Sequence, residues 1–445
     1  MTEPAANQFA LLRTRRFLPL FLVQFLGAFN DQVYKNAFVA LLTFRLADEL
    51  TMSLSLLNLI AGALFILPFA LFAPTAGLIA DGMDKARMMR FVKLSELCIM
   101  GVAVVAYHTQ NLFLLYFVLF LMGAQSAAFA PIKYAVLPQY LRDEELVGGN
   151  GLVQAATFLA ILGGTVAGFQ LVLTEWGVTV VSVAVIAISG AGYAAACAAP
   201  PAPPLGAAPK VDWVFPRAMW RLVASCTDQP AAFRAILAIA WFWFVGATFL
   251  TLLPAYAKEE LGVNDDVVTL LLAAFSVGVA LGALMTEWMS RGEVGPEIAP
   301  IGAVGLGVFS VVLWSITPAL PVEGAELLGI ADFLGTASGW PVLIVFICLA
   351  ASAGLYVTPL NAVLQHEAPP ARRSQFIACS NVVDSGLMVL SSILAAVLVL
   401  SGFSVAQILG MVGGSGVVMA LLVARYAPGT AYGRLALRVW PRGPI

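Results

Sequence analysis

The chain has 445 residues, of which 61% are hydrophobic and only 11% are charged, and its formal net charge is −2. A soluble domain carries about 25% charged residues, so this composition excludes a soluble globular protein and indicates an integral membrane protein. The five cysteines and two histidines form no CxxC pair and no metal-ligand spacing, so we expect neither a metal site nor a cofactor.

The N-terminal residues are polar, and the apolar run after them is too long and too charged for a cleavable signal, so we expect it to remain as the first helix. A helix that crosses a membrane needs about 20 mostly apolar residues. Twelve runs are long enough, at 17–44, 55–80, 88–107, 111–132, 150–173, 178–198, 231–257, 267–290, 297–317, 341–365, 375–400 and 404–425. The sequence therefore predicts an all-α membrane protein with twelve transmembrane helices.

A proline-rich segment separates the sixth run from the seventh and divides the chain into two six-helix halves. Trp213, Phe215 and Trp220 alternate there with Arg217 and Arg221, which predicts a short helix lying in the membrane interface. We predict an N-terminal six-helix bundle at 1–199, a cytoplasmic linker with this helix at 200–229, a C-terminal six-helix bundle at 230–426, and a cytoplasmic tail at 427–445.

The distribution of basic residues predicts the orientation, because Lys and Arg are retained in cytoplasmic loops. With both termini in the cytoplasm, every Lys and Arg falls on the cytoplasmic side except Lys35, Arg45 and Lys258. The charged and Pro-containing segments at 131–151 and 359–382 also echo each other, as expected for two pseudo-symmetric halves of a transporter.

Asn30, Asp31 and Lys35 interrupt the first apolar run near its middle. A charge at mid-membrane costs at least about 2.5 kcal/mol, so these side chains are expected to face a protein interior or a watery cavity. Asp31 and Lys35 are four residues apart and lie on one helical face, in the order that suits an ion pair. The pair can be a structural lock, or Asp31 can bind a coupling cation or proton.

The loop GLIADGMDKARM, residues 77–88, resembles the signature loop of the major facilitator superfamily. The resemblance implies that Gly77 allows close helix contact. Asp81 would accept hydrogen bonds from amides at a helix N-terminus in the other half, with Arg87 or Arg142 as further partners. Breaking these contacts would open a cytoplasmic gate. The alternative is that Lys85, Arg87, Arg90 and Lys93 form only a positively charged cytoplasmic loop.

Further segments resemble the bacterial lysophospholipid transporter family over the whole chain. They are FLGAFNDQVYKNA, the stretch 131–168 that begins PIKYAVLPQYLRDEELVGGNG, WFWFVGATFLTLLPAYAK and PLNAVLQ. The sequence is especially similar to the transporter half of bifunctional proteins that also carry acyltransferase and acyl-carrier-protein synthetase domains. The resemblance implies the major facilitator fold. It also implies movement of lysophospholipids from the outer to the inner leaflet of the bacterial cytoplasmic membrane, where a separate acyltransferase or acyl-ACP synthetase acts on them.

Several polar residues become candidates for such cargo. A phosphate headgroup can compete with Asp31 for Lys35, and Lys133 of PIKY can receive the headgroup or extend to the lipid surface. Glu96 and Asp384 can serve in coupling or in structural hydrogen bonding. Gln24 and Gln154 lie on expected cavity helices, and Asn150 is expected to cap the fifth helix.

The sequence departs from free-standing members of that family, which carry an arginine in the seventh helix and no base at the position of Lys35. The corresponding stretch here, WFWFVGATFLTLLP, contains no arginine. We therefore hypothesise that the positive charge of the cavity has moved to the first helix.

The sequence favours a monomeric transporter and not an enzyme, and it contains no GxxxxGK[ST] nucleotide site. Energy would come from a sodium or proton gradient or from the lipid gradient. The expected partners are a lysophospholipid, that coupling cation and membrane lipids, and no nucleic acid is expected. A cation-coupled exporter of drugs or small metabolites is the alternative on the same fold. A membrane-embedded acyltransferase would need a catalytic histidine deep in the membrane, and neither His108 nor His366 is placed for that role.

Overall fold

The structure is a computed structural model that describes residues 8–44, 54–206, 214–317 and 326–425. These residues are almost entirely helical, and the β pairing found among them is one isolated bridge between Val263 and Leu328. The all-α prediction is confirmed. The predicted tail at 427–445 and linker residues 207–213 lie outside the described residues.

The N-terminal half consists of a short 3-10 helix and six long helices. They are η1 (Gln8–Arg13), α1 (Leu18–Phe44), α2 (Leu54–Gly82), α3 (Lys85–Thr109), α4 (Leu112–Tyr140), α5 (Asp143–Val172) and α6 (Gly177–Ala198). Side-chain caps fix two of the helix starts: Asp84 accepts from the amide of Arg87 at 2.8 Å, and Asn111 accepts from that of Leu114 at 3.0 Å. Gln110 turns the chain between α3 and α4 in the left-handed conformation, at φ 50°.

The C-terminal half repeats this arrangement of long helices after the linker. Its elements are α8 (Pro230–Ala255), η3 (Tyr256–Glu260), α9 (Asp265–Ser290), α10 (Ala299–Ile316), α11 (Ile330–Gly335), α12 (Gly339–Glu367), η4 (Pro370–Arg372), α13 (Arg373–Leu400), α14 (Val405–Gly414) and α15 (Gly416–Ala424). Asn264 caps α9 by accepting from the amides of Asp266 and Val267, and a capping box of Ser404 with Gln407 begins α14.

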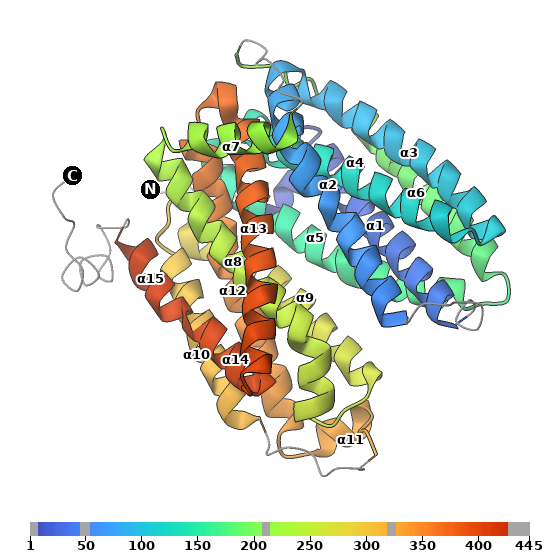
Figure 1. Cartoon of the computed structure of the whole chain (residues 1–445). Coiled ribbons are helices and arrows are strands. Elements are labelled where there is room, and N and C mark those ends of the chain that lie inside the picture. Colours follow the sequence, from blue (N-terminus) through green and yellow to red (C-terminus); the bar gives the residue numbers. More distant parts are fainter. Residues whose placement is uncertain (1–7, 45–53, 207–213, 318–325, 426–445) are drawn as a thin grey trace.

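Helices α1–α6 pack mainly on one another, as do α8–α15, and each cluster of buried apolar residues lies mainly within one half. The halves contact each other chiefly through α2 with α13 and α5 with α9. Figure 1 shows the ribbons of the two halves converging near α7 and diverging toward the opposite end. We call the α7 end the linker end. The predicted domain boundaries agree with this packing and stay a prediction.

Ten helical segments of the described chain are long and apolar enough to cross a membrane. Helices α1 and α3 are not among the ten, and both carry charged residues well inside the helix. The count of twelve transmembrane helices therefore stays a prediction, while the multi-pass membrane architecture is clear.

A short amphipathic helix, α7 (Phe215–Cys226), occupies the linker. It buries Ala218, Leu222 and Cys226, and leaves Trp220 76% exposed. The Phe215 ring packs edge-on against Phe72 of α2, with 5.6 Å between ring centroids. The linker therefore touches both halves, and its position at a membrane surface stays a prediction.

Candidate functional site

A cavity of about 320 Å³ lies between the two halves. Helices α1–α5 line one side of it, and α8, α12 and α13 line the other. We call these sides the N-wall and the C-wall. The cavity brings together five of the eight residues predicted to bind substrate or ion, namely Gln24, Asp31, Lys133, Gln154 and Asp384.

Asp31 of α1 and Lys133 of α4 are the first charged pair of the N-wall. The hydroxyl of Ser126 on α4 donates to one Asp31 carboxylate oxygen at 2.7 Å, and the other oxygen is buried without a described partner. The Lys133 ammonium lies 4.8 Å from the centre of the Tyr134 ring, and no hydrogen bond or ion pair to it occurs within the described residues. Asp31 and Lys133 carry opposite charges and line the same wall of the cavity. This part of the cavity holds an acid and a base that both have bonding capacity left.

Neutral polar groups complete the N-wall beside this pair. Gln24 donates its amide to the hydroxyl of Thr157 at 2.8 Å, and the hydroxyl of Tyr134 donates to Gln154 at 3.1 Å. Gln24 and Gln154 are each 5% exposed, so these hydrogen bonds satisfy buried groups. Both glutamines line the cavity as the sequence predicts.

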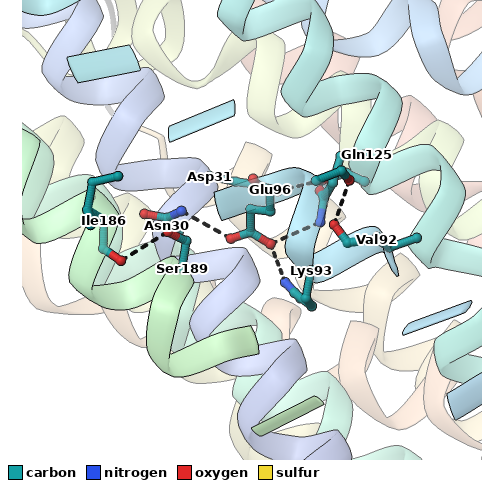
Figure 2. A network of polar contacts seen from close by, with 10 residues as sticks. Asn30, Asp31, Val92, Lys93, Glu96, Gln125, Ile186 and Ser189 are labelled. Atoms are coloured by element: carbon teal, nitrogen blue, oxygen red, sulfur yellow. Dashed lines mark hydrogen bonds and ion pairs between the residues drawn. The ribbon is translucent and has the colours of Figure 1, made fainter. Parts of the chain in front are cut away.

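A second charged cluster lies behind the N-wall, centred on Glu96 of α3. Figure 2 shows Asn30, Lys93 and Gln125 pointing toward this carboxylate from different sides. Lys93 forms an ion pair with it at 2.5 Å, Gln125 donates at 2.9 Å, and Asn30 donates at 3.1 Å. Lys93 also lines the cavity, whereas Asn30 and Glu96 are not among its lining residues. Treating Lys93 as a base of the cytoplasmic loop was wrong, because its side chain is 1% exposed and faces inward.

The C-wall is lined by five apolar residues, three neutral polar residues and one acid. Ile239, Trp243 and Val357 are among its lining residues. Asp384 of α13 is 7% exposed, accepts from Ser380 at 3.3 Å, and keeps one buried oxygen without a described partner. The amide nitrogen of Asn381 is likewise buried without a described partner. The walls therefore differ: positive charge enters the cavity only from the N-wall in the described chain.

Lys35 does not form the ion pair with Asp31 that the four-residue spacing suits, and it is not among the residues that line the cavity. Its side chain is half-buried on α1. Asp31 instead accepts a hydrogen bond from Ser126 of another helix, α4, at one of its two carboxylate oxygens. The hypothesis that Lys35 supplies the positive charge of the cavity loses its support, and Lys133 and Lys93 take that place.

The two halves touch at the linker end where the signature loop resemblance placed a gate. One Asp81 oxygen accepts from the backbone amide of Ser374 at 2.9 Å, and the other accepts from the amide and the side chain of Gln375, both at 3.1 Å. These amides belong to the first turn of α13, whose unpaired donors favour a carboxylate. A Cβ at Gly77 would lie 2.9 Å from the carbonyl oxygen of Ser374, so only glycine permits this approach of α2 to α13.

The two arginines expected near Asp81 have other contacts. The Arg87 guanidinium is exposed and lies 5.6 Å from the centre of the Phe91 ring, and it makes no described contact with Asp81. Arg142 directly precedes α5 and pairs with Glu145 at 3.2 Å. The backbone amides of α13 therefore hold Asp81 in the place of these bases.

A second contact between the halves joins α9 to α5 and was missed by the sequence interpretation. The Glu287 carboxyl group near the end of α9 packs against Gly148 of α5, and a Cβ at Gly151 would lie 2.6 Å from the carbonyl oxygen of Ala283. Ala283 and Glu287 stand four residues apart, as Gly77 and Asp81 do. The same pattern, a small residue followed four positions later by an acid, could have indicated this second contact from the sequence.

Asn150 does not cap α5, because α5 begins seven residues earlier at Asp143, where three acids favour a helix start. Its amide instead forms a reciprocal pair with Gln365 of α12, at 3.0 Å and 2.8 Å. Both side chains are 1% exposed. The pair adds a buried hydrogen-bonded link between the two halves.

Comparison with known proteins agrees with this architecture. Residues 20–378 match the Major Facilitator Superfamily. The lysophospholipid transporter LplT of Serratia proteamaculans is 31% identical over 364 residues, which cover 80% of this chain and 81% of that protein. LplT of Citrobacter koseri is 29% identical over 426 residues, 94% of each chain.

Solved structures show the same fold at low sequence identity. The human organic anion transporter MFSD10 superposes with a TM-score of 0.71 at 14% identity, covering 92% of this chain and 99% of that one. A bacterial homologue of the iron transporter ferroportin, in an outward-facing state, gives 0.61 at 16% identity and covers 91% and 98%. The chain is thus a membrane transporter that belongs to the major facilitator superfamily and, within it, to the lysophospholipid transporter family.

Proposed function

We propose that the protein moves lysophospholipids from the outer to the inner leaflet of the bacterial cytoplasmic membrane by alternating access. The observation that carries this proposal is the contrast between the charged N-wall and the mainly apolar C-wall of one central cavity. A lysophospholipid has a phosphate headgroup and a single acyl chain, so it needs both kinds of surface. The named relatives support the same cargo.

The phosphate would bind Lys133, because this ammonium reaches the cavity with no described hydrogen-bond partner. Lysine is a compact charge that suits a phosphate oxygen. Asp31 would orient Lys133 electrostatically and would take up a coupling cation or proton at its free oxygen. Asp384 holds a second free oxygen across the cavity and is the corresponding candidate on the C-wall. The acyl chain would lie against Ile239 and Trp243.

The contacts at the linker end suggest the state of the transporter. Asp81 with the start of α13, and Glu287 with α5, hold the halves together at this end. We propose that the linker end faces the cytoplasm, so that the structure corresponds to a conformation that receives lipid from outside. Rocking of the halves would break these contacts and release the lipid to the inner leaflet, where a separate acyltransferase or acyl-ACP synthetase would act on it.

Reconstitution of the purified full chain in liposomes tests the proposal. Labelled lysophosphatidylethanolamine is placed in one leaflet, and its translocation is followed with and without sodium and proton gradients. We expect faster translocation of the lysolipid than in protein-free liposomes and little movement of diacyl phosphatidylethanolamine. Soluble glycerophosphoethanolamine, which has the headgroup without the acyl chain, should not be transported. Equal rates for the lysolipid with and without protein would refute the proposed function.

A further inference from the structure

Lys93 and Lys133 approach the same part of the cavity from neighbouring helices. The Lys93 ammonium lies 5.2 Å from the centre of the Phe129 ring, and both residues line the cavity. Phe129 precedes Lys133 by one helical turn on α4, so they share a face of that helix. The N-wall thus presents two ammonium groups, one without a described polar partner and one paired with Glu96.

The place of Lys93 depends on a glycine in α1. A Cβ at position 27 would clash with the Lys93 ammonium, so the absent side chain of Gly27 makes the room that this group occupies. The cavity reaches Gly27 and Lys93 together. The sequence of α1 therefore admits a buried base at the cavity wall.

A buried ion pair is weak evidence for stability, because desolvation of two charges offsets much of their attraction. The surroundings of Glu96 suggest another reason for the pair. Gln125 and Asn30 donate to this carboxylate independently of Lys93, at 2.9 Å and 3.1 Å (Figure 2). Glu96 therefore keeps two hydrogen bonds when Lys93 bonds elsewhere.

We infer that Lys93 is a second phosphate-binding base of the cavity, held ready by Glu96 and transferred to a phosphate oxygen of the headgroup when lipid enters. This inference rests on the proposed function. Glu96, Gln125 and Asn30 are positioning residues, because they act on the phosphate only through Lys93. A phosphate oxygen can replace the carboxylate since both accept charge-assisted hydrogen bonds from an ammonium. With Lys133, the phosphate would then have two cationic contacts.

The double variant Lys93→Gln with Glu96→Gln separates this role from a structural one. It removes both charges, while the two amides can still hydrogen-bond to each other and to Gln125. In the liposome assay we expect the KM for lysophosphatidylethanolamine to rise about tenfold, the size of one charge-assisted hydrogen bond, with a nearly unchanged maximal rate. A wild-type KM in this variant would overturn the inference, because the pair would then be only a structural tie.

Gly27→Ala provides a second variant that keeps every charge and displaces the Lys93 ammonium. We expect this variant to raise the KM as well. If the double variant fails to fold, the KM of Gly27→Ala tests whether Lys93 binds the phosphate. Gly101→Ala on α3 is the matched control, since its Cβ meets no described atom within 4 Å and its KM should not change. A wild-type KM for Gly27→Ala would also contradict the inference.

Two further arms separate the possible failures. If wild-type protein does not translocate the lysolipid, the proposed function fails and the inference fails with it. If wild-type protein is active and the variants match it, only the inference fails. Inorganic phosphate at the same concentration as the lysolipid should not inhibit translocation by the wild-type protein. Inhibition by phosphate at that concentration would show that the site binds free phosphate in place of a lipid headgroup.

Discussion

The two walls of the central cavity are built differently: α1–α5 line the N-wall, and α8, α12 and α13 line the C-wall. The N-wall carries two bases, Lys93 and Lys133, and the acid Asp31. The C-wall carries the acid Asp384 on a mainly apolar surface. On the N-wall, Asp31 accepts from Ser126 of a neighbouring helix, Lys93 pairs with Glu96 one turn away on its own helix, and Lys133 has no described hydrogen-bond partner. Asp384 has its described hydrogen bond from Ser380, one turn away on the same helix. Under the proposed function, a wall with two bases opposite a wall with no base divides the recognition of an amphiphile between the halves.

Loss of the Lys133 charge should weaken headgroup binding at the N-wall more than any other proposed substitution. We expect Lys133→Gln to raise the KM for lysophosphatidylethanolamine about 10- to 100-fold, because one charged hydrogen bond in the cavity is removed. Translocation into liposomes at a series of lipid concentrations measures the effect. Lys35→Gln is the matched control, with the same chemical change on a residue outside the cavity lining. Equal increases of the KM in the two variants would contradict a specific role of the N-wall in binding the headgroup.

A substitution at the contact between α2 and α13 should have the next largest effect. Gly77→Ala would place a methyl group 2.6 Å from the Cβ of Ala378. Overpacking of this kind costs about 1–3 kcal/mol, so the closed state of the linker end should lose about 5- to 100-fold in population. Hydrogen exchange of the α13 amides reports this opening. Gly62→Ala, also on α2, meets no described atom within 4 Å and should exchange like wild type.

The apolar C-wall should affect the acyl chain and leave the headgroup contact unchanged. We expect Trp243→Leu to raise the KM for a long-chain lysolipid about two- to tenfold, the range for loss of an aromatic contact. The KM for a short-chain lysolipid with the same headgroup should change much less. A Trp243→Leu effect that is equal for both chain lengths would place the acyl chain elsewhere.

Asp81 and Glu287 are two acids that join the two halves at the linker end. Neutralising each of them should have the smallest effects of the proposed substitutions, and these effects are measured as rates of amide hydrogen exchange. Asp81→Asn should speed exchange of the Ser374 and Gln375 amides about two- to fivefold, because a charge at a helix N-terminus contributes about 0.3–1 kcal/mol. Glu287→Gln should have less effect on exchange in α5, since one Glu287 oxygen has no described hydrogen-bond partner. A larger effect at Glu287 would reverse the assignment of Asp81 as the stronger contact.

Sequence reasoning predicted features that depend on one helix or on a local repeat. The helices follow the apolar runs closely, and Asp81 accepts from a helix start in the other half as expected. The failures arise where the packing of the helices decides which charges are buried. Spacing on α1 could not show that Ser126 of α4 would donate to Asp31, and charge counting could not show that Lys93 would be buried in an ion pair with Glu96 of its own helix. Membership of a helix is local, whereas the bonding of a buried charge is decided by packing.

Asn150 and Gln365 also bear on how easily the linker end can part. Each side-chain amide donates to the other in the buried interface, and water can offer the same two hydrogen bonds once the helices separate. A hydrogen bond exchanged with solvent changes the free energy by only about 0.5–1.5 kcal/mol. Under the proposed rocking motion, this reciprocal pair is directional in the closed state and costs little free energy to separate, whereas separation of an apolar contact would expose apolar surface to water.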